Sequence, residues 1–171
     1  GIIGASLRST SMRSRLAPQD FLYTLCTKHA DRNEYRVIGA IKNILTISQH
    51  QHQFIELIAS PLIKIITLTI TEKGYCLTSS GELDEQHPDI QRDLSHVNFP
   101  VSAPGLLALG LKYRMEKGSG PISIISCDNL LLNGQSTRQS VTGFASLFTG
   151  KDAHWINDHV IPRGNNVKSF T

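Results

Sequence analysis

The chain has 171 residues, of which 40% are hydrophobic and 18% are charged, which suits one domain with its own core. The formal net charge of +3 gives no case for a nucleic-acid-binding or membrane-surface protein, and no apolar run reaches the roughly 20 residues that span a bilayer. Three cysteines without a CxxC pair argue against a disulfide framework, so we expect a cytoplasmic location.

The first part of the chain is predicted to be mostly β-structure. Residues 1–7 read as a strand that starts at the first residue, which predicts that further sequence precedes it. Residues 12–16 form a short helical turn in this prediction. The β-rich runs at 21–26 and 35–41 flank a polar stretch, a pattern typical of an inserted β-hairpin.

From residue 53 onward, predicted strands alternate with predicted helices. Apolar, β-branched runs at about 63–70 and at 122–126 are typical of buried parallel strands. The expected helices cover residues 53–59, 88–95, 103–117, the region of 141–148, and 152–160. This alternation predicts a Rossmann-like α/β fold: a doubly wound, mostly parallel sheet with the hairpin inserted near its start.

Each apolar strand is followed by a polar tip, and α/β proteins bind ligands beyond the carboxyl ends of parallel strands. Glu72 follows the first strand, beside Lys73. One interpretation is a solvated turn in which the Glu–Lys pair contributes little. The other is a carboxylate that lines a cleft and holds or passes a proton.

Asp128 and Asn129 follow the second strand and leave a similar choice. These residue types commonly cap a following helix. Alternatively, the Asn129 amide could donate a hydrogen bond to a developing alkoxide or to a carbonyl oxygen.

Arg8, Ser9, Thr10 and Ser11 form the polar tip of the first strand. With a phosphate-binding loop upstream, this tip would meet the adenosine ribose of a dinucleotide. An acidic residue there favours a free 2′-hydroxyl, whereas Arg with small hydroxyls could accept a 2′-phosphate. The alternative is an exposed basic turn.

No metal site is expected. His50 and His52 have an i, i+2 spacing within a sequence typical of a polar helix start, without further ligands at useful spacing. The chain also lacks the GxGxxG fingerprint of a dinucleotide-binding loop, and it offers no recognisable Ser-His-Asp or Cys-His arrangement.

Several motifs together resemble the polyol-specific long-chain dehydrogenases, the family of mannitol 2-dehydrogenase and of the fructuronate and tagaturonate reductases. They are GIIGASLRS at 1–9, PQDFLYTL at 18–25, YRVIGAI at 35–41, ITLTITEKGYC at 66–76, HPDIQRDL at 87–94, SAPGLL at 102–107 and SCDNLLLNG at 126–134. The resemblance extends in collinear order to about residue 160.

The resemblance implies an NAD(P)-dependent oxidoreductase that transfers hydride between the nicotinamide and a polyol or its ketose, or a hexuronate. It places Asn129 in the oxyanion hole and Glu72 near the proton path from a catalytic lysine. It places Arg8, Ser9, Thr10 and Ser11 at the cofactor ribose. NAD-preferring members carry acidic residues where this chain has Thr10 and Ser11, so NADP becomes plausible beside NAD.

The resemblance also implies a domain organisation truncated at both ends. Residues 1–160 would be a partial dinucleotide-binding domain without its first strand and Gly-rich loop, and 161–171 an irregular tail. The helical catalytic domain, with its general-base lysine, would be absent. We therefore expect a small-molecule polyol, ketose or hexuronate as the partner, and no activity from this chain alone. The alternative is a non-catalytic α/β module that binds a nucleotide or a partner chain.

Overall fold

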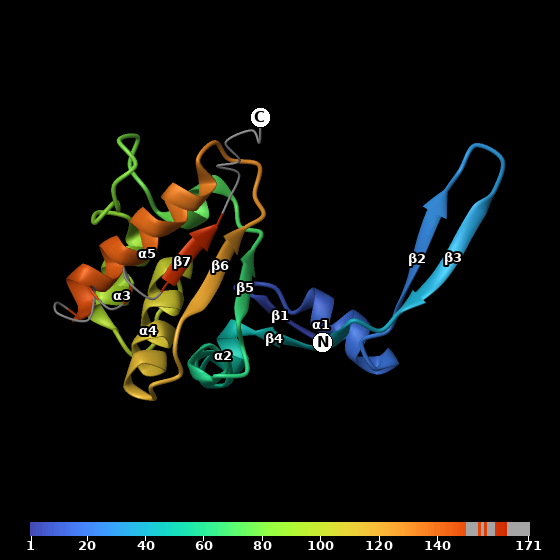
Figure 1. Ribbon diagram of the computed structural model, residues 1–171, viewed down its shortest axis with the longest axis horizontal. Helices are drawn as coiled ribbons and strands as arrows, with labels where there is room; N and C mark the ends of the chain where they lie inside the picture. The colour runs from blue at the N-terminus through green and yellow to red at the C-terminus, as the bar shows by residue number, and fades with distance from the viewer. Residues whose placement is uncertain (150–153, 155, 157–159, 164–171) are drawn as a thin grey trace. The chain divides into compact units, whose positions relative to one another are not determined.

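The computed structural model describes residues 1–149, 154, 156 and 160–163 (Figure 1). Contacts divide the chain into two compact units, Gly1–Phe54 and Ile55–Thr171. Each unit is considered separately below. None of the helices in the described part of the chain has the length and apolar character needed to cross a membrane.

The first unit contains a parallel pair of strands, β1 (Ile2–Ser6) and β4 (Ile41–Thr46). Their carboxyl ends lie side by side, because Ser6 is the register partner of Thr46. After β1 the chain enters α1 (Ser11–Leu16) and the 3₁₀ helix η1 (Ala17–Gln19). The polar tip of β1 therefore leads directly into a short helix.

An antiparallel hairpin separates β1 from β4, as predicted. It consists of β2 (Tyr23–Lys28) and β3 (Asn33–Ile38), with Tyr23 opposite Ile38 and Lys28 opposite Asn33. The His29 N–H donates to the Arg32 carbonyl oxygen across the turn, at 2.8 Å. Every strand residue except Tyr23 and Ile38 is exposed.

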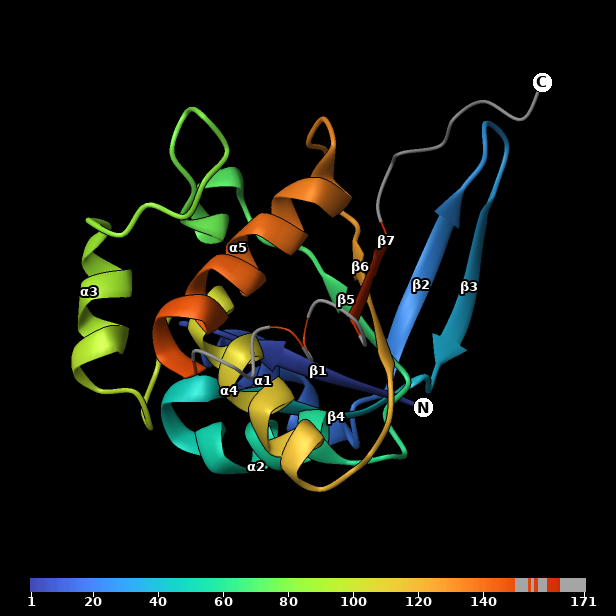
Figure 2. The ribbon, with the colours of Figure 1, turned by 60° about the vertical axis from the view of Figure 1, so that its left-hand side comes forward.

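The second unit is built on a parallel three-stranded sheet in the order β5-β6-β7 (Figures 1 and 2). Its strands are β5 (Ile65–Leu68), β6 (Ile122–Ser126) and β7 (Val160–Arg163). The helices are α2 (Ile47–Ala59), which begins in the first unit, α3 (Pro88–Ser95), α4 (Ala103–Glu116) and α5 (Asn133–Thr149), with the 3₁₀ helix η2 (Glu72–Tyr75) after β5. The predicted parallel α/β architecture with an inserted hairpin is confirmed.

Helix α4 is the centre of the second unit's core, because it is buried on nearly all sides. Residues 103–111 are all buried, and a helical stretch buried in this way is expected to be apolar around its whole circumference, as these nine residues are. Its first turn is fixed by Ser102, whose hydroxyl oxygen accepts from the Gly105 N–H at 3.0 Å. Ser102 in turn donates to Asp93, a fully buried carboxylate of α3 that also accepts from the Val101 N–H. Polar groups thus hold the ends of α3 and α4 together.

Arg114 of α4 is fully buried and donates only to main-chain carbonyls among the described residues. Two of these carbonyls, of Ile58 and Ser60, lie at the end of α2, at 2.8 and 2.7 Å. The other three belong to the turn that enters β6, namely Ser119, Gly120 and Pro121. Burial lowers the pKa of the guanidinium. The five carbonyl oxygens take the place of its water shell.

Two predicted elements differ from those observed in the first half of the chain. The run predicted at 35–41 is divided, because β3 ends at Ile38 and a separate strand, β4, begins at Ile41. Helix α2 begins at Ile47 rather than at residue 53, and it contains a non-helical residue, His50, with φ −131° and ψ 26°. This irregularity breaks the periodicity on which the helix prediction rested.

The end of the chain also differs from its prediction. Val160, expected as the last residue of a helix, and residues 161–163, expected to begin a tail, form β7 beside β6. Pro162 faces Ile124 in this ladder, and proline is tolerated because β7 has one neighbour among the described strands. Most of the helix predicted at 152–160, and the remainder of the predicted tail, lie outside the described residues.

Replacing Arg114 tests its role in stability. Arg114→Met should lower the free energy of unfolding by about 3 kcal/mol, because several buried carbonyls lose charge-assisted hydrogen bonds. Arg114→Lys should also destabilise, since an ammonium cannot reproduce the planar fork of donors. Urea denaturation followed by circular dichroism measures the effect. Arg92→Met, at an exposed position of α3, is the control and should change stability by less than about 0.5 kcal/mol. Equal stability of both Met variants would contradict the role of Arg114.

Candidate functional site

The first candidate region is the tip of β1, where Arg8, Ser9, Thr10 and Ser11 are all exposed. The loop is shaped by its own hydroxyls: Ser6 Oγ accepts from the Ser9 N–H at 3.1 Å, and Ser9 Oγ accepts from the Ser11 N–H at 3.2 Å. Such side-chain to backbone bonds favour turns over continued strand. The predicted cofactor-binding residues therefore occupy one turn at the carboxyl end of a parallel strand.

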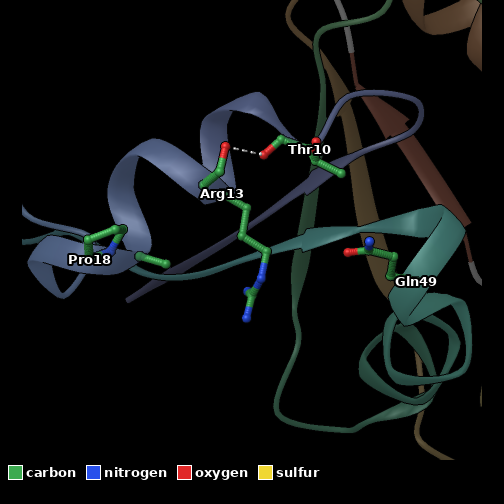
Figure 3. Close-up of a pocket in the computed structure, with 6 residues that line it drawn as sticks. Thr10, Arg13, Pro18 and Gln49 are labelled. Atoms are coloured by element: carbon green, nitrogen blue, oxygen red, sulfur yellow. Dashed lines mark hydrogen bonds between the residues drawn. The ribbon is translucent and has the colours of Figure 1, made fainter.

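An open pocket of about 500 Å³ lies beside this turn (Figure 3). Thr10 lines it from the turn and Gln49 from the first turn of α2, and α1 and η1 supply the rest. Of the residues predicted to bind cofactor, Thr10 alone is among those lining this pocket. Its volume falls within the range of small-molecule sites.

Arg13 brings a positive charge to the same pocket, and sequence reasoning missed it. Its guanidinium donates to Asn43 Oδ1 at 2.7 Å and to the Ile44 carbonyl oxygen at 2.5 Å. It also lies over the Phe21 ring, 5.9 Å from the centroid. In the described part of the chain no carboxylate is paired with it. The charge is thus held in place without being neutralised.

Thr46, at the carboxyl end of β4, carries an orphaned polar atom. Its side chain is fully buried, and among the described residues Oγ1 has no hydrogen-bond partner. An unpaired buried hydroxyl costs about 1–3 kcal/mol, so its presence calls for an explanation. It sits beside Ser6 in the ladder, at the edge where the predicted cofactor residues begin.

The second candidate region is formed by the tips of β5 and β6. These strands are adjacent and parallel, with Leu68 paired to Ser126, and the Cys127 N–H donates to the Leu68 carbonyl oxygen at 2.8 Å. Glu72 opens η2 after β5, and Asn129 lies three residues beyond β6. Both side chains are exposed, and neither makes a hydrogen bond or ion pair within the described residues. The two predicted catalytic residues thus follow the same edge of one sheet.

Tyr75 and Asp128 join these two tips. The Tyr75 hydroxyl donates to Asp128 Oδ2 and lies 2.7 Å from Ser126 Oγ. Ser126 Oγ also contacts Asp128 Oδ2, at 3.1 Å. The buried Asn133 amide donates to the carbonyl oxygens of Asp128 at 2.9 Å and Ser126 at 3.3 Å. This network fixes the backbone that carries Asn129.

The network bears on one of the two interpretations of the Asp128–Asn129 pair, the one in which Asp128 caps a helix. Helix α5 begins only at Asn133, five residues after Asp128. The Asp128 carboxylate instead accepts hydrogen bonds from the hydroxyls of Tyr75 and Ser126. The interpretation of Asp128 as a helix cap is therefore wrong. Burial, and next the hydrogen bond to Asp128, raise the pKa of Tyr75 to about 12.

The sequence contained only a weak signal for this network. Tyr75 lies in the motif that follows β5, but nothing in its spacing indicates that it reaches Asp128, 53 residues away. A separate question is whether a metal ion could bind. The described part of the chain contains no group of three His, Cys, Asp or Glu side chains that could hold one.

The fold and these tips define a Rossmann-like α/β domain. A family model described as the mannitol dehydrogenase Rossmann domain matches residues 1–163. The chain belongs to this family, which confirms the resemblance seen in its motifs.

Similar proteins cover nearly the whole chain. It is 37% identical to mannitol 2-dehydrogenase of Cereibacter sphaeroides over 95% of its length, and 39% identical to the uncharacterized oxidoreductase YeiQ of Escherichia coli K12 over 98%. The structure of Pseudomonas fluorescens mannitol 2-dehydrogenase, a ternary complex with NAD and D-mannitol, matches 95% of the chain with a TM-score of 0.87 and 39% identity. A substrate-free D-sorbitol dehydrogenase matches with a TM-score of 0.87 and 27% identity.

These matches confirm the predicted Rossmann-like fold. The chain spans about a third of the length of these relatives: 35% of each of the two curated proteins and 34% of the Pseudomonas fluorescens enzyme.

The raised pKa of Tyr75 predicts a specific alkaline instability. The folded state holds the phenolic proton more tightly than the unfolded chain, whose tyrosine pKa is near 10.0. This stabilisation is complete below pH 10 and is lost as the pH rises to about 12. Urea denaturation between pH 9 and 12 should show a steep loss of stability in the unchanged chain and a shallower one in Tyr75→Phe. Tyr35→Phe, at a residue 68% exposed, should keep the steep loss. Identical slopes in all three proteins would refute the assignment.

Proposed function

We propose that the chain is the cofactor-binding part of an NAD(P)-dependent oxidoreductase that interconverts a polyol and its ketose. A hexuronate is the alternative substrate. The observation that carries the proposal is the placement of Glu72 and Asn129 after adjacent parallel strands, with exposed, unbonded side chains. Ligands bind at this edge of α/β sheets. Membership of the mannitol dehydrogenase family, and a fold similar to that of an enzyme complexed with NAD and D-mannitol, support it.

The tip of β1 fits the adenosine side of such a cofactor. Arg8, Ser9, Thr10 and Ser11 would hold the ribose, and no carboxylate occurs among residues 7–16. Among the described residues the Thr46 hydroxyl lacks a hydrogen-bond partner, and a polar ligand at this edge would supply one. A nicotinamide dinucleotide, once bound, supplies or accepts the hydride.

At the other tip, Asn129 and Glu72 would act on the substrate oxygen and its proton. The Asn129 amide would donate to the carbonyl or alkoxide oxygen and stabilise its developing charge. Glu72, exposed to solvent, would hold or pass the proton that the substrate hydroxyl loses. Tyr75 and Asp128 would position the turn rather than react, since each already satisfies the other.

We assign the rest of the catalytic machinery to a further domain of the enzyme, outside residues 1–160. Leu131 and Leu132, two and three residues after Asn129, are 90% and 46% exposed and would meet that further domain. A general-base lysine there would complete the site, so the 171 residues alone should be inactive. The three free cysteines support a cytoplasmic location.

Cofactor preference tests the tip of β1. We expect the product of the complete reading frame to favour NADPH over NADH, because Arg8 and the hydroxyls of Thr10 and Ser11 suit a 2′-phosphate. Ser11→Asp should reduce kcat/KM with NADPH by at least about tenfold through like-charge repulsion, while NADH is less affected. Ser95→Asp, at an exposed position of α3, is the matched control. A clear NADH preference in the unchanged enzyme would overturn the NADP assignment and leave the oxidoreductase proposal intact.

The role of Asn129 is tested in the same enzyme. Asn129→Ala should lower kcat for ketose reduction by about 10²-fold, the usual effect of removing one oxyanion donor. Asn98→Ala, at an exposed position between α3 and α4, should leave kcat unchanged. If neither polyols nor hexuronates are converted by the unchanged enzyme, the proposed function fails.

A further inference from the structure

The pocket beside the tip of β1 is lined by polar groups that have no partner within the described residues. All of its lining residues belong to the first unit, Gly1–Phe54 (Figure 3). The Thr10 hydroxyl and the Gln49 side-chain amide make no hydrogen bond in the described part of the chain. Polar groups placed in this way around a pocket fix the orientation of a ligand.

Arg13 is the only charged residue among those that line this pocket. Its hydrogen bonds to Asn43 Oδ1 and to the Ile44 carbonyl oxygen both come from Nη1. Nε and Nη2 make no hydrogen bond within the described residues. These two nitrogens form one edge of the planar guanidinium, and such an edge donates two parallel hydrogen bonds to a phosphate or a carboxylate. The arginine therefore keeps a complete two-pronged donor.

The Arg13 side chain is held in position by its neighbours. Asn43 Oδ1, which accepts from it, is itself fixed, because it also accepts from the Ile44 N–H at 2.8 Å. The Phe21 ring lies against the guanidinium. Ordering a long side chain on binding reduces affinity, and a side chain that is already ordered avoids most of this loss. Arg8, in contrast, is exposed at the tip of β1.

The charge of Arg13 favours an anion in this pocket. No carboxylate is among the lining residues, and none occurs in residues 7–16, which carry the tip of β1 and α1. A fork of two donors matches an anion with two oxygens on one atom. A nicotinamide dinucleotide has phosphate groups but no carboxylate, so phosphate is the anion that the proposed cofactor can offer.

We propose that Arg13 binds the 2′-phosphate of NADP(H), an inference that rests on the proposed function and deepens it. Thr10 links the pocket to this particular phosphate, because it belongs both to the turn that would hold the ribose and to the pocket lining. A phosphate on that ribose would extend into the pocket. The volume of about 500 Å³ is much larger than one phosphate group, and Ala17 and Pro18 add apolar surface for part of the adenosine.

Cofactor kinetics of the enzyme made from the complete reading frame test the role of Arg13. Arg13→Met should lower kcat/KM with NADPH by at least about tenfold, because a charged bidentate contact is lost. With NADH, which has no 2′-phosphate, we expect a change of less than about twofold. Arg13→Lys should restore only part of the NADPH activity, since an ammonium lacks the fork. Arg15→Met removes the same charge at an exposed position of α1 and is the control; it should change neither value by more than about twofold.

A second measurement uses the unchanged enzyme, because Arg13 also joins α1 to β4 and its replacement affects their packing. Calorimetric titrations with 2′-AMP, 5′-AMP and adenosine compare the same nucleoside with the phosphate in one position, in another, and absent. The affinity for 2′-AMP should exceed the other two by at least about tenfold.

Two results would overturn the proposal. One is an equal fall of kcat/KM with both cofactors in Arg13→Met, which would show a structural role only. The other is an affinity for 2′-AMP no higher than that for 5′-AMP. An enzyme that reduces ketoses with NADH and is insensitive to Arg13→Met would refute the phosphate site and leave the proposed function intact. Selective binding of 2′-AMP without conversion of polyols or hexuronates would refute the function and leave the phosphate site.

Discussion

A buried guanidinium joins the segments that lead into two neighbouring strands. Arg114 binds carbonyls at the end of α2, just before β5, and carbonyls of the turn just before β6. Ser119 reinforces the link, because its hydroxyl donates to the Ala59 carbonyl oxygen at 2.6 Å. The start of each strand is thereby set relative to the other. Their parallel register, and hence the position of both tips, depends on this contact.

The tips show how structural and reactive groups are separated. Tyr75 and Asp128 satisfy each other between the ends of β5 and β6, so they hold the turn in place. Glu72 and Asn129, on the same turns, keep side chains that are exposed and unbonded within the described residues. A site that binds and releases substrate needs both kinds of residue: rigid support, and polar groups without prior partners.

Much of the fold was predictable because its signals are local. The buried strands β5 and β6 are continuous β-branched runs, and α4 begins with a capping serine and a proline. Strand β4 was missed because Lys42 and Asn43 interrupt its apolar pattern. Strand β7 was missed because Pro162 argues against a strand, and only its place beside β6 makes the residue acceptable. Such elements are defined by their neighbours rather than by their own residues.

The sequence by itself determined the α/β class, the hairpin, and the polar residues at the strand tips, because apolar periodicity and turn residues act over short distances. It also determined the family, since several motifs occur in collinear order. Only the tertiary structure decided that Arg114 is buried among carbonyls, that Arg13 lines a pocket, and that the Tyr75 hydroxyl donates a hydrogen bond to Asp128. These contacts join residues distant in the chain, and their energies depend on burial and register. Neither quantity exists until the strands have paired.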